Sequence, residues 1–103
     1  MIGFAVSKNG VKIRLTEERW FHITESHDYM SGLSGDVLEA ITKPEEIIQG
    51  DQGELIAIQK FNKNHVVVIY REVDDKDGFV ITSFITSEID RVRKGRKVIW
   101  KNK

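Results

Sequence analysis

The second half of the chain contains three candidate β-strands that are joined by very short connections. The strands span residues 54–61, 65–73 and 78–87 and are rich in β-branched and aromatic residues. The connecting residues, 62–64 and 74–77, are turn sequences too short for a parallel crossover. We therefore expect the three strands to pair antiparallel as a meander, a requirement that constrains the fold more than any other feature of the sequence.

The middle strand contains a run of four apolar residues, 66–69. Successive side chains of a strand point to opposite faces, so this run is apolar on both faces and is typical of a strand covered on both sides. We expect it at the centre of the sheet. Residues 44–49 form a candidate edge strand, and residues 98–100 a candidate last strand.

Two helix starts precede these strands. Thr16 is expected to cap a first helix that ends near His27, with acidic residues in the first turn. Ser34 is expected to cap a second helix, which Pro44 ends near residue 42. At both starts, apolar residues flank the cap at the spacing of a hydrophobic staple.

The N-terminal residues 3–6 and 11–15 are strand-like, and Asn9-Gly10 between them favours a tight hairpin turn. The order of elements predicts an α+β fold, in which two N-terminal helices pack on an antiparallel meander sheet of about four strands, with a short N-terminal hairpin. A 40% hydrophobic content and a single proline favour one globular domain over residues 1–103.

The absence of cysteine excludes a disulfide framework and a thiolate zinc site, and it suits a reducing cytosol. No charged region precedes the first apolar residues, and no apolar run approaches the roughly 20 residues of a membrane span. We therefore expect a cytoplasmic protein with no membrane partner.

The formal net charge is zero, but the charges are unevenly distributed. Residues 91–103 contain seven basic and no acidic residues, whereas residues 1–90 contain nine basic and sixteen acidic ones. The C-terminal segment therefore carries +7 and the rest of the chain −7. Such a segment is either a phosphate-binding strip or a solvated tail that keeps the protein in solution.

The first helix carries two of the three histidines. A helical wheel places Trp20, Ile23 and His27 on the face that meets the sheet. His22 lies about 140° away from His27, so the two are not expected to act on one atom while both are helical. Either residue is a candidate acid or base, or a packing or surface residue, and His65 is expected to be structural. No histidine has metal-ligand spacing with another histidine or a carboxylate, so no metal site is indicated.

Polar residues interrupt the apolar strands. Alternation places Thr82, Phe84 and Thr86 on one face of the last strand of the meander, and Lys60 and Arg71 lie on the two preceding strands. Hydroxyls, an aromatic ring and an arginine on one face are suited to holding a phosphate and stacking a base. Threonine is also common on solvent-facing strands without any such role. The opposite, core face is expected to hold Ile81, Ser83 and Ile85.

The sequence lacks GxxxxGK[ST], GxGxxG and GxSxG motifs and a cysteine nucleophile, which leaves chemistry run by histidine, arginine, lysine and hydroxyl groups. These groups can cleave RNA without a metal. A base removes the 2′-OH proton, the oxygen attacks the adjacent phosphate, an acid protonates the leaving 5′-oxygen, and cations stabilise the transition state.

Several short stretches resemble the phage- and toxin-associated barnase–EndoU–colicin E5/D–RelE-like (BECR) nuclease domains. The resemblance implies a small RelE-like α+β RNase fold with N-terminal helices and a four-stranded antiparallel sheet, usually metal-independent and often part of a toxin, phage or mobile-element system. The stretches that carry it are residues 15–23, 27–30, 43–48, 70–71, 78–84 and 94–100.

By position, the resemblance implies that the helix histidine of this family is His22 or His27, that the strand arginine is Arg71 and that the hydroxyl of the late strand is Thr82. Related domains often have tyrosine two residues after that threonine, where this chain has Phe84. The change keeps an aromatic ring for stacking but removes a hydroxyl.

The first hypothesis is therefore a metal-independent endoribonuclease that needs no cofactor, with His27, His22, Arg71 and Thr82 as the catalytic candidates. The alternatives are a non-catalytic protein- or nucleic-acid-binding module and an antitoxin- or immunity-type protein. The expected partners are RNA and a cognate antitoxin or inhibitor protein. The candidate substrate-binding residues are Lys60, Phe84, Thr86, Arg91 and Arg93.

Overall fold

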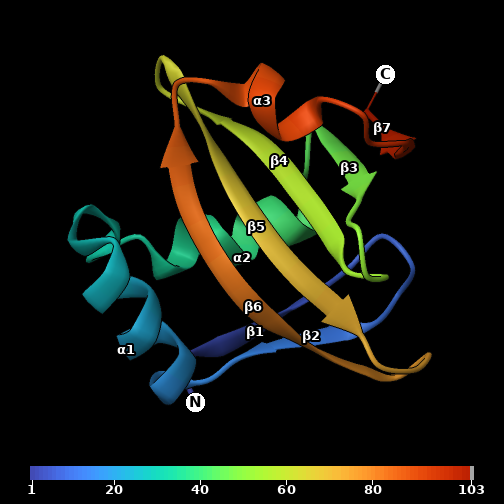
Figure 1. The fold of residues 1–103 in the computed structure, drawn as a ribbon. Helices are drawn as coiled ribbons and strands as arrows, with labels where there is room; N and C mark the ends of the chain where they lie inside the picture. The colour runs from blue at the N-terminus through green and yellow to red at the C-terminus, as the bar shows by residue number, and fades with distance from the viewer. Residues whose placement is uncertain (103) are drawn as a thin grey trace.

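The computed structural model describes residues 1–102, which form a seven-stranded sheet with three α-helices and one 3₁₀ turn (Figure 1). In chain order the elements are β1 Gly3–Val6, β2 Lys12–Leu15, α1 Glu17–Ser26, η1 Asp28–Met30, α2 Ser34–Thr42, β3 Glu46–Gln49, β4 Leu55–Phe61, β5 Asn64–Glu72, β6 Asp77–Thr86, α3 Ile89–Arg93 and β7 Val98–Lys101. The strand order across the sheet is β1-β2-β6-β5-β4-β3-β7.

The predicted meander is confirmed as the middle of this sheet. Strands β4, β5 and β6 pair antiparallel in sequence order, and β5 is the central strand of the seven. Val66, Val67 and Val68 are each at most 1% exposed, as the run of apolar residues predicted. The candidate edge strand at residues 44–49 also forms, as β3.

The predicted four-stranded antiparallel sheet is wrong in its extent and its strand directions. The N-terminal hairpin joins the same sheet, because β2 pairs parallel with β6 at Ile13↔Gly78. A Cβ atom at Gly78 would collide with the Arg71 backbone carbonyl on β5 and would lie 2.7 Å from the Ile13 side chain on β2, so the close packing of β6 between these two strands depends on glycine. At the other edge, β7 pairs antiparallel with β3. The length of a connection indicates how two strands that are adjacent in sequence pair. It does not predict the β2–β6 and β3–β7 pairings, which join segments far apart in the chain.

The first helix begins as predicted, and the second does not. The Thr16 hydroxyl accepts a hydrogen bond from the Arg19 backbone N–H at 3.1 Å, which confirms Thr16 as the N-cap. Ser34, expected to cap α2, is instead its first residue, because the chain enters from η1 and the Leu33 carbonyl accepts the first helical bond, from Val37. Among residues 1–102, no helix combines the length and apolar character that crossing a bilayer requires.

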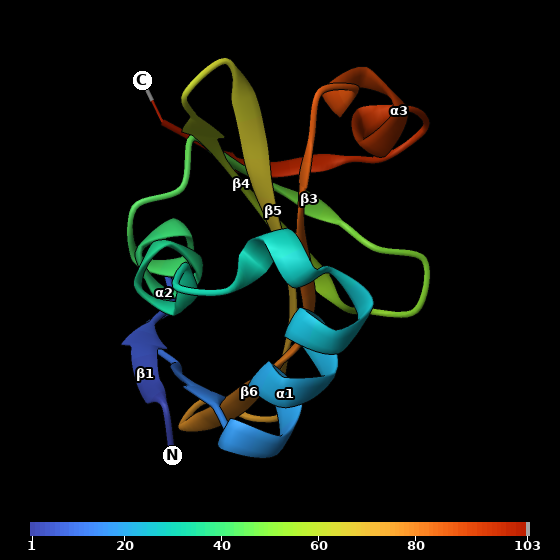
Figure 2. The same ribbon diagram turned by 90° about the vertical axis from the view of Figure 1, so that its left-hand side faces the viewer.

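The two faces of the sheet are covered differently. The face packed against α1 and α2, here called the inner face, holds the larger apolar cluster, which includes Ile13, Ile23, Ile41 and Tyr70. The opposite, outer face holds a smaller cluster beneath α3. Figure 2 shows α2 and α3 on opposite sides of the sheet. The residues of the smaller cluster are Ile48, Ile56, Ile58, Val67 and Ile89, with Ile69, Phe84 and Val92 at its margin.

Candidate functional site on the outer face of β5 and β6

The predicted alternation in β6 is confirmed over its C-terminal part. Phe84 pairs with Val67, and Thr82 pairs with Ile69, all four on the outer face. The side chain of Ser83 is buried on the inner face, where its hydroxyl donates a hydrogen bond to the Val67 carbonyl at 2.7 Å. The expected core set of Ile81, Ser83 and Ile85 is altered at Ile81, which the register leaves unpaired at a β-bulge.

His27 is the helix histidine that the structure brings to this face. It ends α1 with φ −136°, and its backbone N–H still donates to the Ile23 carbonyl. Its half-buried ring lies 5.6 Å from the ring of Tyr29 and 6.1 Å from that of Phe84, measured between centroids. The imidazole therefore lies beside β6, next to the outer-face residue Phe84.

His22 lies apart from this group. It is exposed on α1, and its ring packs edge-on against Phe21 at 6.0 Å. The separation agrees with the helical wheel, which placed the two histidines on different sides of the helix. The structure therefore joins one of the two predicted helix histidines, His27, to the sheet residues.

Arg71 is on the outer face of β5, but its guanidinium is engaged at the β3–β4 loop. The register pairs Arg71 with Phe79 and Ile69 with Thr82, so Arg71 and Thr82 lie on the same face of adjacent strands. The guanidinium donates to the Gln52 carbonyl at 3.1 Å. Hydrogen bonds from the backbone N–H groups of Gln52 and Glu54 lower the pKa of the Glu54 carboxyl, and the Arg71 charge adds to this effect. Arg71 thus stabilises a loop as well as facing the candidate site.

A row of polar residues crosses the outer face over β4, β5 and β6. His65 on β5 pairs with Lys60 on β4 and with Thr86 on β6. The Thr86 hydroxyl accepts a hydrogen bond from the Glu88 backbone N–H at 3.0 Å, just before α3, so this residue helps to turn the chain. His65 is expected from the sequence to be structural, although strand alternation also places it on the same face as Arg71, six residues further along β5.

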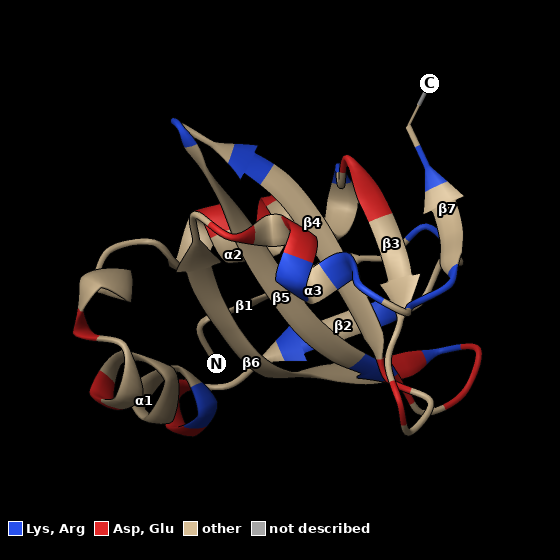
Figure 3. Ribbon diagram, turned by 45° about the horizontal axis from the view of Figure 1, so that its top comes forward, with Lys and Arg blue, Asp and Glu red and all other residues tan. Residues whose placement is uncertain are grey.

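The two predicted phosphate-binding arginines of the C-terminal segment form ion pairs. Arg93 contacts the buried Glu46 carboxylate at 2.6 Å, and Arg91 lies 3.3 Å from Glu88. A further ion pair joins Arg96 to Asp51 at 3.1 Å. Figure 3 shows the basic residues of α3 and β7 near the acidic start of β3. Part of the +7 charge of this segment is therefore neutralised by acids of the preceding chain.

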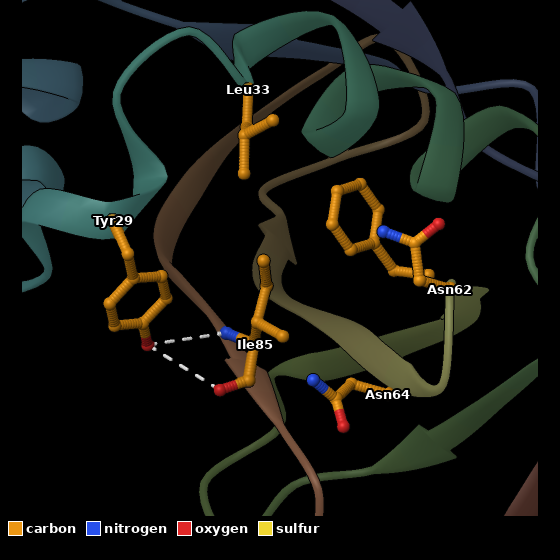
Figure 4. A pocket seen from close by; sticks show the side chains of 6 residues that line it. Tyr29, Leu33, Asn62, Asn64 and Ile85 are labelled. Carbon is orange, nitrogen blue, oxygen red and sulfur yellow. Dashed lines mark hydrogen bonds between the residues drawn. The ribbon is translucent and has the colours of Figure 1, made fainter.

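A pocket that the sequence did not predict lies on the inner-face side of the sheet (Figure 4). One of its walls is Tyr29, whose ring neighbours that of His27. Its volume is about 520 Å³, within the range typical of small-molecule sites. It lies between η1, the start of α2 and the β4–β5 hairpin, with Tyr29 on one side and Asn62 opposite. The residues that line it are Tyr29, Leu33, Phe61, Asn62, Asn64 and Ile85.

No protein-family model matches the chain, and comparisons with curated proteins and with solved structures find no significant match. Among residues 1–102, no three histidine or acidic side chains are grouped so that they could hold a metal ion. The residues of the candidate site are His27, His65, Thr82, Phe84 and Lys60.

Proposed function

We propose that this protein binds single-stranded RNA across the outer face of β5 and β6 and cleaves it by attack of the 2′-OH on the adjacent phosphate. The observation that carries the proposal is the position of His27, whose half-buried ring lies against Phe84 on the face that Thr82 also occupies. A titratable imidazole, an aromatic stacking surface and a hydroxyl at one place are the groups that RNA cleavage uses.

In this reaction the neutral imidazole of His27 takes the proton of the 2′-OH. The freed oxygen forms a bond to phosphorus, and the bond from phosphorus to the 5′-oxygen breaks. His65, diagonal to Phe84 across the β5–β6 pair, donates a proton to the leaving oxygen, and the Lys60 ammonium beside it stabilises the negative charge. The products are a 2′,3′-cyclic phosphate and a 5′-hydroxyl.

The test is incubation of end-labelled single-stranded RNA with the purified protein in the presence of a chelator. We expect fragments that end in cyclic phosphate, and a loss of about 100-fold or more in rate for His27→Ala, as for removal of a general base. His22→Ala is the matched control, since it removes a histidine from the same helix away from the outer face, and it should keep the wild-type rate. Intact RNA with the wild-type protein excludes cleavage.

A non-catalytic RNA-binding module is the second candidate. Two observations favour it: the Arg71 guanidinium and the Thr86 hydroxyl both have hydrogen-bond partners within the protein, so both have structural roles that need no substrate. The same assay separates the two functions when RNA binding is measured in parallel, since this module would retain RNA without cutting it. In either case we propose a cytoplasmic location, which the absence of cysteine supports.

The resemblance to BECR nuclease domains supports the catalytic proposal only through short stretches of sequence around His27, Arg71 and Thr82. Membership of that family is itself a proposal. A toxin, phage or mobile-element context and a cognate inhibitor protein depend on it. The protein's toxicity when expressed in bacteria, relieved by His27→Ala, would support that context.

A further inference from the structure

The pocket beside His27 combines flat apolar walls with free amide groups. Tyr29 and Phe61 provide aromatic rings, and Leu33 and Ile85 provide aliphatic surface. Aromatic side chains stack unpaired bases of single-stranded RNA with little dependence on sequence. The walls are therefore suited to a planar heterocycle.

The polar groups of the pocket are the side chains of Asn62 and Asn64. Within residues 1–102, neither side-chain amide has a hydrogen-bond partner in the structure, and Asn64 is half-buried. A carboxamide both donates and accepts hydrogen bonds, which is the pattern that the exposed edge of a nucleobase also presents. Asn62 is the first residue of the tight β4–β5 turn and Asn64 is the first residue of β5, paired with Phe61, so the hairpin sets their positions relative to each other.

Tyr29 gives this pocket a fixed wall and a connection to the proposed reaction centre. Its hydroxyl lies 3.3 Å from the Ile85 backbone nitrogen and 3.5 Å from the Ile85 carbonyl oxygen, so both ends of the side chain are held (Figure 4). Its ring contacts that of His27, which in turn contacts Phe84. A continuous aromatic path therefore leads from the pocket to the outer face.

We propose that this pocket is a nucleobase subsite, which holds the unstacked base of a nucleotide next to the phosphate at His27. In this arrangement Tyr29 and Phe61 contact the faces of the base, and Asn62 and Asn64 bond to its edge. The inference rests on the proposed RNA function, since it assigns the base that accompanies the phosphate bound on the outer face.

The test is an NMR titration of the ¹⁵N-labelled wild-type protein, since nucleoside 3′-monophosphates lack the bond to a 5′-oxygen that the proposed reaction breaks and so are not turned over. The probes are the four nucleoside 3′-monophosphates, with ribose 5-phosphate as a control that lacks a base. We expect the nucleotides to shift the amide signals of Asn62, Asn64 and Ile85, and ribose 5-phosphate to leave them unchanged. Preference for one base would identify the edge that the amides recognise.

Two variants check the pocket directly. Asn62 has a positive φ of 56°, so Asn62→Gly removes the amide without straining the turn. Combined with Asn64→Ala, it should weaken nucleotide binding by at least about tenfold, as expected for the loss of paired hydrogen bonds. Leu33→Trp should block binding by filling the cavity. Asn102→Ala is the control, because it removes an exposed amide outside this pocket.

The outcomes separate this inference from the proposed function. Cleavage of RNA by the wild-type protein, with nucleotide shifts confined to residues around Thr82, would overturn the base subsite and keep the nuclease. Nucleotide shifts at the pocket in a protein that leaves RNA intact would keep the subsite and overturn cleavage. Equal shifts with ribose 5-phosphate, or unchanged binding by the double asparagine variant, would also overturn the subsite.

Discussion

The two faces of the sheet share the same strands but differ in what covers them. On the inner face, α1 and α2 enclose Val66, Val68 and Tyr70 completely. On the outer face α3 covers one end, and Thr82 and Phe84 remain partly exposed. Because side chains alternate along a strand, neighbouring residues of β5 and β6 lie on different faces, one enclosed by helices and the other partly exposed. We expect inner-face residues to determine stability and the exposed outer-face residues to determine binding.

The largest difference in stability is expected between two variants, Ile41→Ala in the core beneath the inner face and Thr82→Ala on the outer face. Ile41 is fully buried on α2, and its truncation should lower the free energy of unfolding by about 3 kcal/mol through lost burial and a residual cavity. Thr82→Ala should change it by less than about 0.5 kcal/mol while lowering RNA cleavage. Urea unfolding followed by circular dichroism measures both. Equal losses of stability would contradict the separation of the faces.

The end of the outer face that α3 covers should behave like a core. Arg93→Ala would leave the Glu46 carboxylate, only 5% exposed, without its partner. Because Arg93 is itself one-third exposed, we expect a loss of about 2 to 3 kcal/mol, at or below the range for a fully buried pair. Arg91→Ala is the matched control on the same helix, since its ion pair with Glu88 is exposed and should contribute less than about 0.5 kcal/mol. Thermal and urea unfolding distinguish them.

A substitution on the inner face, at Tyr70, is expected to change the free energy of unfolding less than Ile41→Ala or Arg93→Ala, and it should increase stability. The Tyr70 hydroxyl is buried and, among residues 1–102, has no hydrogen-bond partner. Burial, together with the nearby Glu72 charge, raises the pKa of this phenol. Tyr70→Phe removes the unsatisfied group, so the free energy of unfolding should rise by about 1 kcal/mol. The urea midpoint should increase with an unchanged m-value. A decrease would indicate that the hydroxyl is satisfied in solution.

Most local features of the sequence predicted local features of the fold; the exception is the cap of α2, which is Leu33 and not Ser34. The cap at Thr16, the central position of residues 66–69 and the antiparallel pairing around the 62–64 turn all depend on neighbouring residues, and all are confirmed. The parallel pairing of β2 with β6 was not predicted, because it joins segments separated by most of the chain. Gly78, where a Cβ atom would collide with the Arg71 carbonyl and with the Ile13 side chain, indicates only that β6 packs closely between β5 and β2 at this point.

The candidate site was predictable to the extent that it follows strand periodicity. Alternation placed Thr82 and Phe84 together, and the helical wheel separated His22 from His27. The contact of His27 with Phe84 depends on where α1 ends, which the wheel alone does not define. The pocket was not predictable, because three separate stretches of the chain, residues 29–33, residues 61–64 and Ile85, line it and none of them carries a motif.

The hydrogen bonds of Tyr29 to Ile85 also bear on how the protein avoids self-association. β2 pairs with β6 only as far as Phe79, so the C-terminal half of β6 would otherwise present open backbone groups on that side. Tyr29 occupies the bonding groups of Ile85 there. Such an edge can template the addition of a strand from a second molecule, the first step toward aggregation. Tyr29 is thus a candidate gatekeeper against fibril formation, in addition to lining the pocket.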